Sequence, residues 1–557
     1  MMKLSNAHQR KLEIISKIAA QAYEQPLLGS GLMFLQDIRD NFYYASYLFE
    51  ASQHPAILFP YDRAAAKAKA EHILQEVLNL QDQEPVSPTY GHWPLQLRPT
   101  PQEAPMNTLP VELMGSLMVF FYQCNKENLG ETLSKSFENA ILHIYRSHFY
   151  RKPLEHFNHH EAKYTAAKLI LGQFYEDKAL LKDGLESLQG TLDRVTAIGM
   201  SEYGALPWFW HWVQAFTCAW ELMENSEIKA VLGQMLDYLW GVRSTYYLKG
   251  TWVGPHSRGW PHDIPQDKNV LLDYVQYGDF TLPDEMPRTE YAGLLFYEAP
   301  SSFKAIALER SIPAEVKRIV SRPAALAKYG GELLHSYVHI TENYAIGGMW
   351  ERQLEFDNEQ HRWDVTLPLD AVEGVNRAFF FHPGERYADG DSRHQSEYEH
   401  VLLHQNVVAA LYQIPAEQPD EIVGCLPPGE WIEDQGALFG HCGKAFIAVY
   451  VNRPYQREVL SDRSVVKSRG RTNAVVVECI DAASALVKGI TDLRQFAARM
   501  TRKRPAFDQS SAGNYELTYF TLQDEVLALA IDEKLNIDRF VNGKAVDFHD
   551  YTVNESQ

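Results

Sequence analysis

Residues 201–216, SEYGALPWFWHWVQAF, place acid–base side chains among flat aromatic rings. Within the helix expected over most of this segment, Trp208, His211 and Trp212 share one face by their spacing. Indole faces can stack on sugar rings, because C–H groups of the sugar meet the negative face of the ring. Tyr203 lies just before the helix, and a tyrosine whose pKa is lowered by nearby cations can remove and return a proton. The segment therefore predicts a sugar-binding wall beside a proton-transfer site, unless His211 is a core histidine with satisfied hydrogen bonds.

A second segment of unusual composition, GPHSRGWPHD, occupies residues 254–263. Its glycines and prolines break any helix, and its charged groups stand among histidines and tryptophan. Arg258 is suited to holding a carboxylate through two parallel hydrogen bonds, and His256 to moving protons near neutral pH. The competing interpretation is an ion pair between Arg258 and Asp263 that stiffens the loop.

Residues 158–161, Asn-His-His-Glu, mark the start of a helix. An asparagine followed three residues later by a glutamate is close to a capping box. If this helix start faces a cavity, the Asn158 amide could also hydrogen-bond a substrate carboxylate. Adjacent histidines point in different directions, whereas a helical metal pair needs a four-residue spacing. We therefore expect no metal, and no cofactor either, since the sequence has no phosphate-binding or dinucleotide-binding loop.

Apolar residues recur at three- and four-residue spacing as far as about residue 325, which predicts a helical region. Short links make neighbouring helices antiparallel, and their irregular lengths favour a ring of hairpins, an (α/α) toroid, over a regular solenoid. Shorter helices are predicted at residues 266–277, 289–298 and 313–322. Long helices are predicted at residues 7–23, 34–51, 61–80, 110–127, 130–149, 159–175, 178–198, 207–224 and 226–247.

Beyond Gly330 and Gly331 the pattern changes to short apolar segments rich in β-branched and aromatic residues. Gly, Pro, Asn and Asp separate these segments, which predicts an antiparallel β-sandwich. The expected fold is therefore an α+β multidomain protein. Residues 1–330 would form an (α/α) toroid that carries the site, and residues 331–557 an antiparallel β-sandwich domain.

Two long polar segments could also contribute to a site. The proline-rich link at residues 81–107 is an irregular segment of the kind that is often functional. Its aromatic residues, Trp93 among them, either pin the loop to the domain or roof a cleft. In the β region, the stretch at residues 382–400 is expected to lean on the helical domain, and it lacks the regular spacing of an EF-hand calcium loop.

The charge balance excludes several classes of partner. The chain has 52 Lys+Arg and 72 Asp+Glu, a formal net charge of −20, which argues against nucleic acid and against an anionic membrane surface. The N-terminus lacks the apolar core of a signal peptide, and no apolar run is long enough to span a membrane. Five scattered cysteines without a CxxC pair favour free thiols in a reducing compartment. We therefore expect a cytoplasmic protein whose oligomeric state, a homodimer included, is left open.

A helical toroid followed by a β-sandwich resembles polysaccharide lyases of the chondroitin AC lyase, alginate lyase and heparinase II/III-like groups. At the level of motifs, Ser-Glu-Tyr at 201–203 and Gly-Pro-His-Ser-Arg at 254–258 look like short signatures of such toroid proteins, without assigning a subfamily. The resemblance implies cleavage of a uronate-containing glycan by β-elimination. By residue type, the catalytic positions would be filled by Asn158, Tyr203, His211, His256 and Arg258, with Tyr164 or Tyr291 as alternatives for the tyrosine.

β-Elimination needs the residue types that this sequence gathers. Donors that neutralise the uronate carboxylate let an enolate-like transition state form, while a base removes the C5 proton and an acid protonates the leaving O4. A glycoside hydrolase would instead need two carboxylates about 5–10 Å apart, for which Glu202 and Asp263 are candidates. A non-catalytic carbohydrate-binding protein is the third alternative. The expected partner is an acidic oligosaccharide, bound by Glu202, Trp208, Trp212, Trp252, Trp260, His262, Trp93 and His159.

Overall fold

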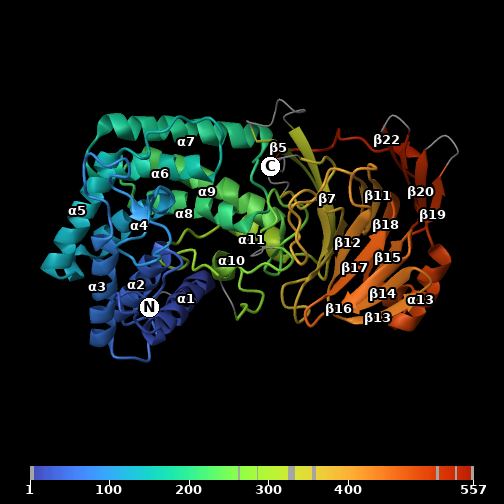
Figure 1. The fold of residues 1–557 in the computed structure, drawn as a ribbon, viewed down its shortest axis with the longest axis horizontal. Helices are drawn as coiled ribbons and strands as arrows, with labels where there is room; N and C mark the ends of the chain where they lie inside the picture. Colours follow the sequence, from blue (N-terminus) through green and yellow to red (C-terminus); the bar gives the residue numbers. More distant parts are fainter. Residues whose placement is uncertain are drawn as a thin grey trace.

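The computed structural model describes residues 5–260, 264–284, 287–323, 333–353, 359–509, 514–532 and 536–553. The chain forms an α+β multidomain fold with a helical N-terminal part and a sheet-rich C-terminal part (Figure 1). Two residues that the sequence analysis singled out, His262 and Asp263, lie outside the described residues.

The long helices predicted from the sequence are all present, with ends that differ by a few residues. Successive helices pack as pairs, α2 with α3, α4 with α5, α6 with α7 and α8 with α9. Two short ladders, β1 (Trp93–Pro94) with β2 (Met106–Asn107) and β3 (Tyr247–Leu248) with β4 (Thr251–Trp252), and the 3-10 turn η1 (Lys126–Asn128) lie between them. The helices are α1 (Asn6–Glu24), α2 (Ile38–Gln53), α3 (Arg63–Asn79), α4 (Leu109–Asn125), α5 (Glu131–Ser147), α6 (His159–Phe174), α7 (Lys178–Ile198), α8 (Leu206–Leu222), α9 (Ser226–Thr245), α10 (Leu271–Gln276) and α11 (Ser301–Leu308).

The helical hairpins form an inner and an outer layer. Helices α2, α4, α6 and α8 contact one another in turn, and each has its hairpin partner packed behind it. Helices α4 and α8 are buried on nearly every face, which explains why their sequences are apolar all round. This layering is the one expected of toroid hairpins, and it places the few polar residues of the inner helices in a shared interior.

Two of the short helical predictions are wrong. Residues 314–321 form strand β5 (Ala314–Ser321), which pairs along its whole length with β6 (Leu333–Ile340). Residues 289–298 form turns, and the helix of this region is α11 instead. Helix α10 lies within the range predicted at 266–277.

The C-terminal part consists of antiparallel sheets. The largest has the strand order β16-β17-β12-β9-β8-β7-β6-β5, the second β10-β11-β18-β15-β14-β13 and the third β19-β20-β21-β22-β23. The C-terminal part also contains helices α12 (Ala482–Val487) and α13 (Leu493–Met500) and the 3-10 turn η3 (Thr501–Lys503). The strands after β6 are β7 (Ala345–Met349), β8 (Trp363–Thr366), β9 (Arg377–Phe381), β10 (Glu399–His404), β11 (Val407–Gln413), β12 (Glu421–Leu426), β13 (Glu430–Asp434), β14 (Ala437–Cys442), β15 (Ala445–Val451), β16 (Tyr455–Val459), β17 (Ser464–Arg469), β18 (Thr472–Asp481), β19 (Ala506–Gln509), β20 (Tyr515–Phe520), β21 (Val526–Ile531), β22 (Ile537–Val541) and β23 (Lys544–Ala545).

The six-stranded sheet is buried on both faces. In β11, Val408 and Ala410 join a core shared with the eight-stranded sheet, whereas Val407 and Ala409 join a core shared with the third sheet and α13. Side chains alternate between the two faces of a strand, so burial of both faces requires an uninterrupted apolar sequence. This explains apolar runs such as the one in β15.

The helical part and the eight-stranded sheet share one core. Val316 of β5 and Val338 of β6 belong to the same buried cluster as the helical residues. Across this contact, the Arg377 guanidinium of β9 donates to the Trp252 carbonyl oxygen and to the Asp267 carboxylate. Among the described residues, no helix is both long and apolar enough to cross a membrane. All five cysteines are free, and all except Cys124 are buried.

Candidate functional site

Helix α6 begins with reciprocal hydrogen bonds, as the sequence pattern predicts. The Asn158 Oδ1 atom accepts from the backbone N–H groups of His160 (3.0 Å) and Glu161 (3.1 Å). The Glu161 carboxylate in turn accepts from the backbone N–H groups of residues 155–157. These bonds satisfy donors that have no partner within the helix. Only the oxygen of the Asn158 amide takes part in the cap, so within the described part of the chain its NH₂ group remains a donor at the helix start.

The first histidine of α6, His159, is bound to Glu202. Its ring Nδ1 and its backbone N–H both contact the Glu202 carboxylate at 2.6 Å, and Trp212 Nε1 donates to the same carboxylate at 2.8 Å. Burial lowers the pKa of His159 to about 4 against the opposing effect of Glu202, so the imidazole is neutral at physiological pH. Burial alone would raise the pKa of Glu202, but His159 and the other donors hold it below its ordinary value. Glu202 therefore fixes the starts of α6 and α8 relative to each other.

The second histidine, His160, is bound to a different carboxylate, Glu112 of α4. The His160 Nδ1 atom lies 2.8 Å from Glu112 Oε2, Lys163 Nζ lies 2.5 Å from the same oxygen, and the Tyr164 hydroxyl donates to Oε1 at 2.8 Å. Burial opposes ionisation of Glu112, but the His160 hydrogen bond and the Lys163 charge bring its pKa down to about 2. An ionised carboxylate only accepts, so Nδ1 of His160 carries a hydrogen, and in the neutral imidazole the lone pair is on Nε2.

The exposure of His160 distinguishes it from its neighbour His159. Its side chain is 36% exposed, whereas the side chain of neighbouring His159 is 6% exposed. The two rings lie 4.1 Å apart, centroid to centroid. His160 is therefore the imidazole of this pair that can exchange a proton with a bound molecule.

Aromatic rings and guanidinium groups continue from this helix start and form what we call the Trp208–Trp260 surface, made of Trp208, Trp260, Arg258 and Arg393. The Trp208 ring lies 5.9 Å from His159 and 4.9 Å from Trp260. Arg258 lies over Trp208 at 4.5 Å and Arg393 over Trp260 at 5.5 Å. Both arginine side chains are 25% exposed. Arg393 also makes a bidentate pair with Asp391 through contacts of 2.6–3.0 Å, so the surface offers aromatic rings and guanidinium N–H donors rather than an unpaired positive charge.

Arg258 pairs with Glu359, a residue of the C-terminal part. Its Nε atom donates to Glu359 Oε2 at 2.6 Å, and Arg393 NH1 lies 3.9 Å from the other oxygen of that carboxylate. The ion pair expected within the loop would have involved Asp263, which lies outside the described residues. The pair with Glu359 brings the helical and sheet-rich parts together beside the Trp208–Trp260 surface.

His211 of helix α8 is another neighbour of His159. The two rings are 5.5 Å apart, and His211 Nε2 lies 3.4 Å from Arg288 NH1. Burial, followed by the positive charge of Lys163, lowers the pKa of His211 well below its ordinary value. His211 therefore enters any chemistry as a neutral imidazole.

Tyr203 and His256, two of the residues expected to be catalytic, face the sheet-rich part instead. The Tyr203 hydroxyl accepts a hydrogen bond from Gln360 Nε2 at 2.9 Å, and only 4% of the residue is exposed. His256 is fully buried and exchanges backbone hydrogen bonds with His361. The structure thus places these two side chains at the contact between the two parts of the chain.

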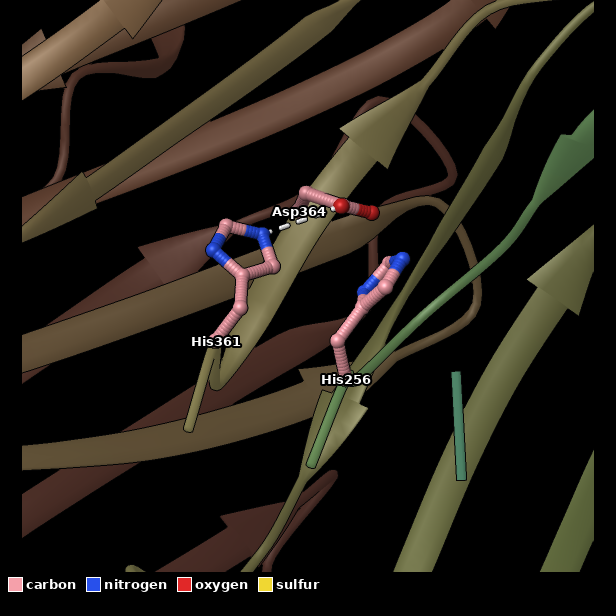
Figure 2. A group of neighbouring side chains, drawn as sticks. All are labelled: His256, His361 and Asp364. Carbon is pink, nitrogen blue, oxygen red and sulfur yellow. Dashed lines mark hydrogen bonds and ion pairs between the residues drawn. The ribbon is translucent and has the colours of Figure 1, made fainter. Parts of the chain in front are cut away.

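Figure 2 shows the surroundings of His256, in which His361 and Asp364 could offer further metal ligands. Their ligand atoms lie within 4.8 Å of one another. Asp364, however, already accepts from His361 Nε2 (3.0 Å) and from Arg377 NH1 (2.6 Å). The Arg377 guanidinium supplies the positive charge that this carboxylate needs, and it holds the pKa of Asp364 below its ordinary value although burial opposes this. The Asp364 carboxylate is thus neutralised within the chain.

Three of the tryptophans expected to bind substrate, Trp93, Trp212 and Trp252, are sealed in the core. Trp93 is fully buried, and its Nε1 donates to the Val77 carbonyl oxygen at 2.9 Å. Trp252 is also fully buried and stacks on Tyr246 with ring centroids 5.2 Å apart. The structure brings together these members of the predicted set: Asn158, His159, Glu202, Trp208, His211, Trp212, Arg258 and Trp260.

Glu112 and Lys163 are absent from the sequence-based set of site residues, although the sequence contains signals for them. His160, Lys163 and Tyr164 are three and four residues apart, so they share one face of α6. Glu112 is an isolated carboxylate in an otherwise apolar helix, and such a group needs a buried partner. A polar face on one inner helix opposite a lone acid on another indicates a buried ionic cluster.

No protein-family model matches the sequence, and no curated protein matches it. Among solved structures, the chain is similar to a heparinase III at 9% identity, with 98% of this chain and 91% of that chain covered and a TM-score of 0.49. It is similar to a chondroitinase AC lyase at 8% identity, with 98% and 99% covered and a TM-score of 0.44. It is also similar to a chondroitin AC lyase variant from Streptomyces coelicolor A3 at 10% identity, with 94% and 92% covered and a TM-score of 0.39. At this level of similarity, function has to be inferred from the side chains of this chain itself.

Proposed function

We propose that the protein is a lyase that cleaves uronate-containing oligosaccharides by β-elimination, with His160 as the group that moves the proton. The observation that carries the proposal is the His160–Glu112 pair, which the His159 ring links to the Trp208–Trp260 surface. It combines a partly exposed imidazole, a carboxylate that fixes its tautomer, and an aromatic surface with two guanidinium groups whose N–H donors suit an acidic sugar.

The binding step uses the surface beside α6. A uronate ring would pack against the Trp208–Trp260 surface, where Trp260 is the more exposed indole, and its carboxylate would face the Arg258 guanidinium and the Asn158 amide NH₂. These donors lower the free energy of the enolate-like transition state, because negative charge builds up on the carboxylate as the C5 proton leaves. A neutral sugar would lack this stabilisation.

The proton-transfer step uses the lone pair on His160 Nε2. The imidazole takes the C5 proton, the C5–H electrons form the C4=C5 double bond, and the C4–O4 bond breaks. The imidazolium that results is stabilised by ionised Glu112 and can return the proton to the leaving O4. We assign the base to His160 rather than to Tyr203, because the Tyr203 hydroxyl is buried and already accepts from Gln360.

The experiment is a screen of uronate-containing oligosaccharides that reads two products separately. β-Elimination gives an unsaturated uronate, which absorbs in the ultraviolet, whereas hydrolysis gives a new reducing end without unsaturation. The proposal expects unsaturated product from acidic glycans and none from neutral glycans of the same linkage. New reducing ends without unsaturation would indicate a glycoside hydrolase, and binding without turnover would indicate a carbohydrate-binding protein; either outcome contradicts the proposal.

A further inference from the structure

A small polar cavity lies where helix α2 begins, and His211 and Gln214 of α8 form part of its lining. Its volume is about 80 Å³. A buried water needs at least about 10–15 Å³ of such space, so the cavity has room for several waters or for the carboxylate end of a sugar acid. We call it the Arg288 cavity, and its polar lining is made of Asp37, Arg39, Asp40, Tyr43, His211, Gln214, Arg288, Thr289 and Glu290.

The Arg288 guanidinium has no carboxylate partner within the part of the chain that the structure describes. Its hydrogen-bonding contact there is His211 Nε2 at 3.4 Å, and His211 is a neutral imidazole. The other arginine of the cavity, Arg39, differs in this respect, because it makes a bidentate pair with Asp37 through contacts of 2.5–3.0 Å. Arg288 is therefore the cation of this cavity whose charge is not neutralised by a direct ion pair.

Several buried polar atoms of the cavity-lining residues lack hydrogen-bond partners among the described residues. They are His211 Nδ1, Gln214 Oε1, Thr289 Oγ1 and Glu290 Oε1. Gln214, Thr289 and Glu290 are each less than 5% exposed. A buried polar group without a partner costs about 1–3 kcal/mol, so four of them around one cavity point to a polar occupant that pairs with them.

The backbone that carries these residues is strained. Glu290 and Tyr291 both have φ of +53°, in the left-handed region that residues with a side chain rarely adopt. Such strain costs about 1–3 kcal/mol per residue and tends to occur at ligand sites, where the surrounding structure holds it. Here the Tyr47 hydroxyl donates to the Ala292 carbonyl oxygen at 2.7 Å and holds the segment from the α2 side.

We propose that the Arg288 cavity binds the carboxylate end of a sugar acid, with Arg288 on the carboxylate and Gln214 and Thr289 on adjacent hydroxyl groups. The ligand class follows from the groups present: a guanidinium without a direct ion pair among the described residues favours an anion, and the unpaired amide oxygen and hydroxyl group favour a ligand with hydroxyls. The inference deepens the proposed function, on which it rests for the uronate, because it assigns a second contact region for an acidic glycan beyond the Trp208–Trp260 surface.

Binding should depend on pH, because carboxyl groups surround Arg288. Burial raises the pKa of Asp40 and that of Glu290 to about 7 each. Below pH 7 both groups are mostly neutral and Arg288 is free to hold an anion, whereas above pH 7 they become negative and compete with it. Of the other groups near Arg288, Asp37 and Arg39 pair with each other, burial lowers the pKa of His211 so that it is neutral, and burial raises the pKa of Tyr43. Asp284 lines an adjoining pocket together with Arg288.

The test is calorimetric titration of the purified protein with glucuronate, glucose and glucosamine. We expect glucuronate to bind and glucose to bind at least about tenfold more weakly. Glucuronate binding should weaken about tenfold between pH 6 and pH 8.5, because one pKa unit of interaction corresponds to a tenfold change in affinity. Arg288→Gln should weaken glucuronate binding at least about tenfold. Arg469→Gln, a control at a side chain that is 78% exposed on β17, should not change it.

Gln214→Glu provides a second variant in case Arg288→Gln disturbs folding, because it keeps the shape and adds a negative charge next to Arg288. It should also abolish glucuronate binding. Unchanged glucuronate affinity in either folded variant, equal affinity for glucose, or preference for glucosamine would overturn the inference. If glucuronate does not bind while glycans are still cleaved, only the second contact region is contradicted. If glucuronate binds but no glycan is cleaved, only the proposed function is contradicted.

Discussion

Replacing Glu112 by Gln tests whether the buried ion pair between Glu112 and Lys163 stabilises the inner layer of helices. The Glu112 and Lys163 side chains are 5% and 4% exposed, and their charged atoms lie 2.5 Å apart. Removing one partner of a buried ion pair leaves an uncompensated charge and costs about 3–5 kcal/mol. Glutamine keeps the size and can still hydrogen-bond His160 and Tyr164, so the loss should come from the charge of Lys163. We therefore expect Glu112→Gln to lower the free energy of unfolding in urea by about 3–5 kcal/mol at pH 7.

Two further measurements separate the charge effect from loss of packing. The penalty should shrink as pH rises, because burial already lowers the pKa of Lys163 and an unpaired lysine loses its proton more readily still. The double variant Glu112→Gln/Lys163→Met should recover most of the loss. Glu186→Gln, which breaks the exposed pair with Lys182, is the control and should cost less than about 0.5 kcal/mol. If Glu112→Gln costs no more than Glu186→Gln, the buried pair does not exist as described.

The remaining predictions concern Tyr203 and Glu478. Tyr203→Phe removes the acceptor of the buried Gln360 amide, so it should lower the free energy of unfolding by about 1–3 kcal/mol. Turnover, measured on the same preparation, should be unchanged. Loss of turnover would instead indicate that Tyr203 is the base. Burial raises the pKa of Glu478 from its ordinary value of 4.5 to about 7, so the folded protein holds a proton that the unfolded chain releases. The stability from this proton is present below about pH 4.5 and is lost as pH rises to about 7, at up to about 1.4 kcal/mol per pH unit. Urea unfolding of Glu478→Gln should show a flatter pH dependence in that range, and an equal slope in both proteins would contradict the assignment.

Local periodicity predicted the helical part well, because helices depend on spacing that can be read within one segment. The prediction failed at residues 314–321, where Val316, Ile319 and Val320 have helical spacing. Three of these eight residues are β-branched apolar ones, and pairing with β6 along the full length decides in favour of a strand. A single segment cannot reveal that partner, which lies beyond it in the chain.

The candidate site was predicted less completely than the fold. Residue types alone do not distinguish a partly exposed indole, such as Trp260, from one sealed in the core, such as Trp252. The same limit applies to Tyr203, whose neighbours come from the sheet-rich part. Glu112 and His160 lie 48 positions apart in the sequence and meet only because α4 and α6 pack side by side.

The most direct test of the proton-transfer role is the turnover of His160→Gln on the best glycan from the screen, followed by the ultraviolet absorbance of the unsaturated product. Glutamine can still hydrogen-bond Glu112 but cannot take a proton at neutral pH. We predict that turnover falls by about 10²–10⁴-fold, the usual contribution of general acid–base catalysis, while affinity for the glycan and the free energy of unfolding change little. Turnover within a few fold of the unmodified protein would contradict the assignment of His160 as the base.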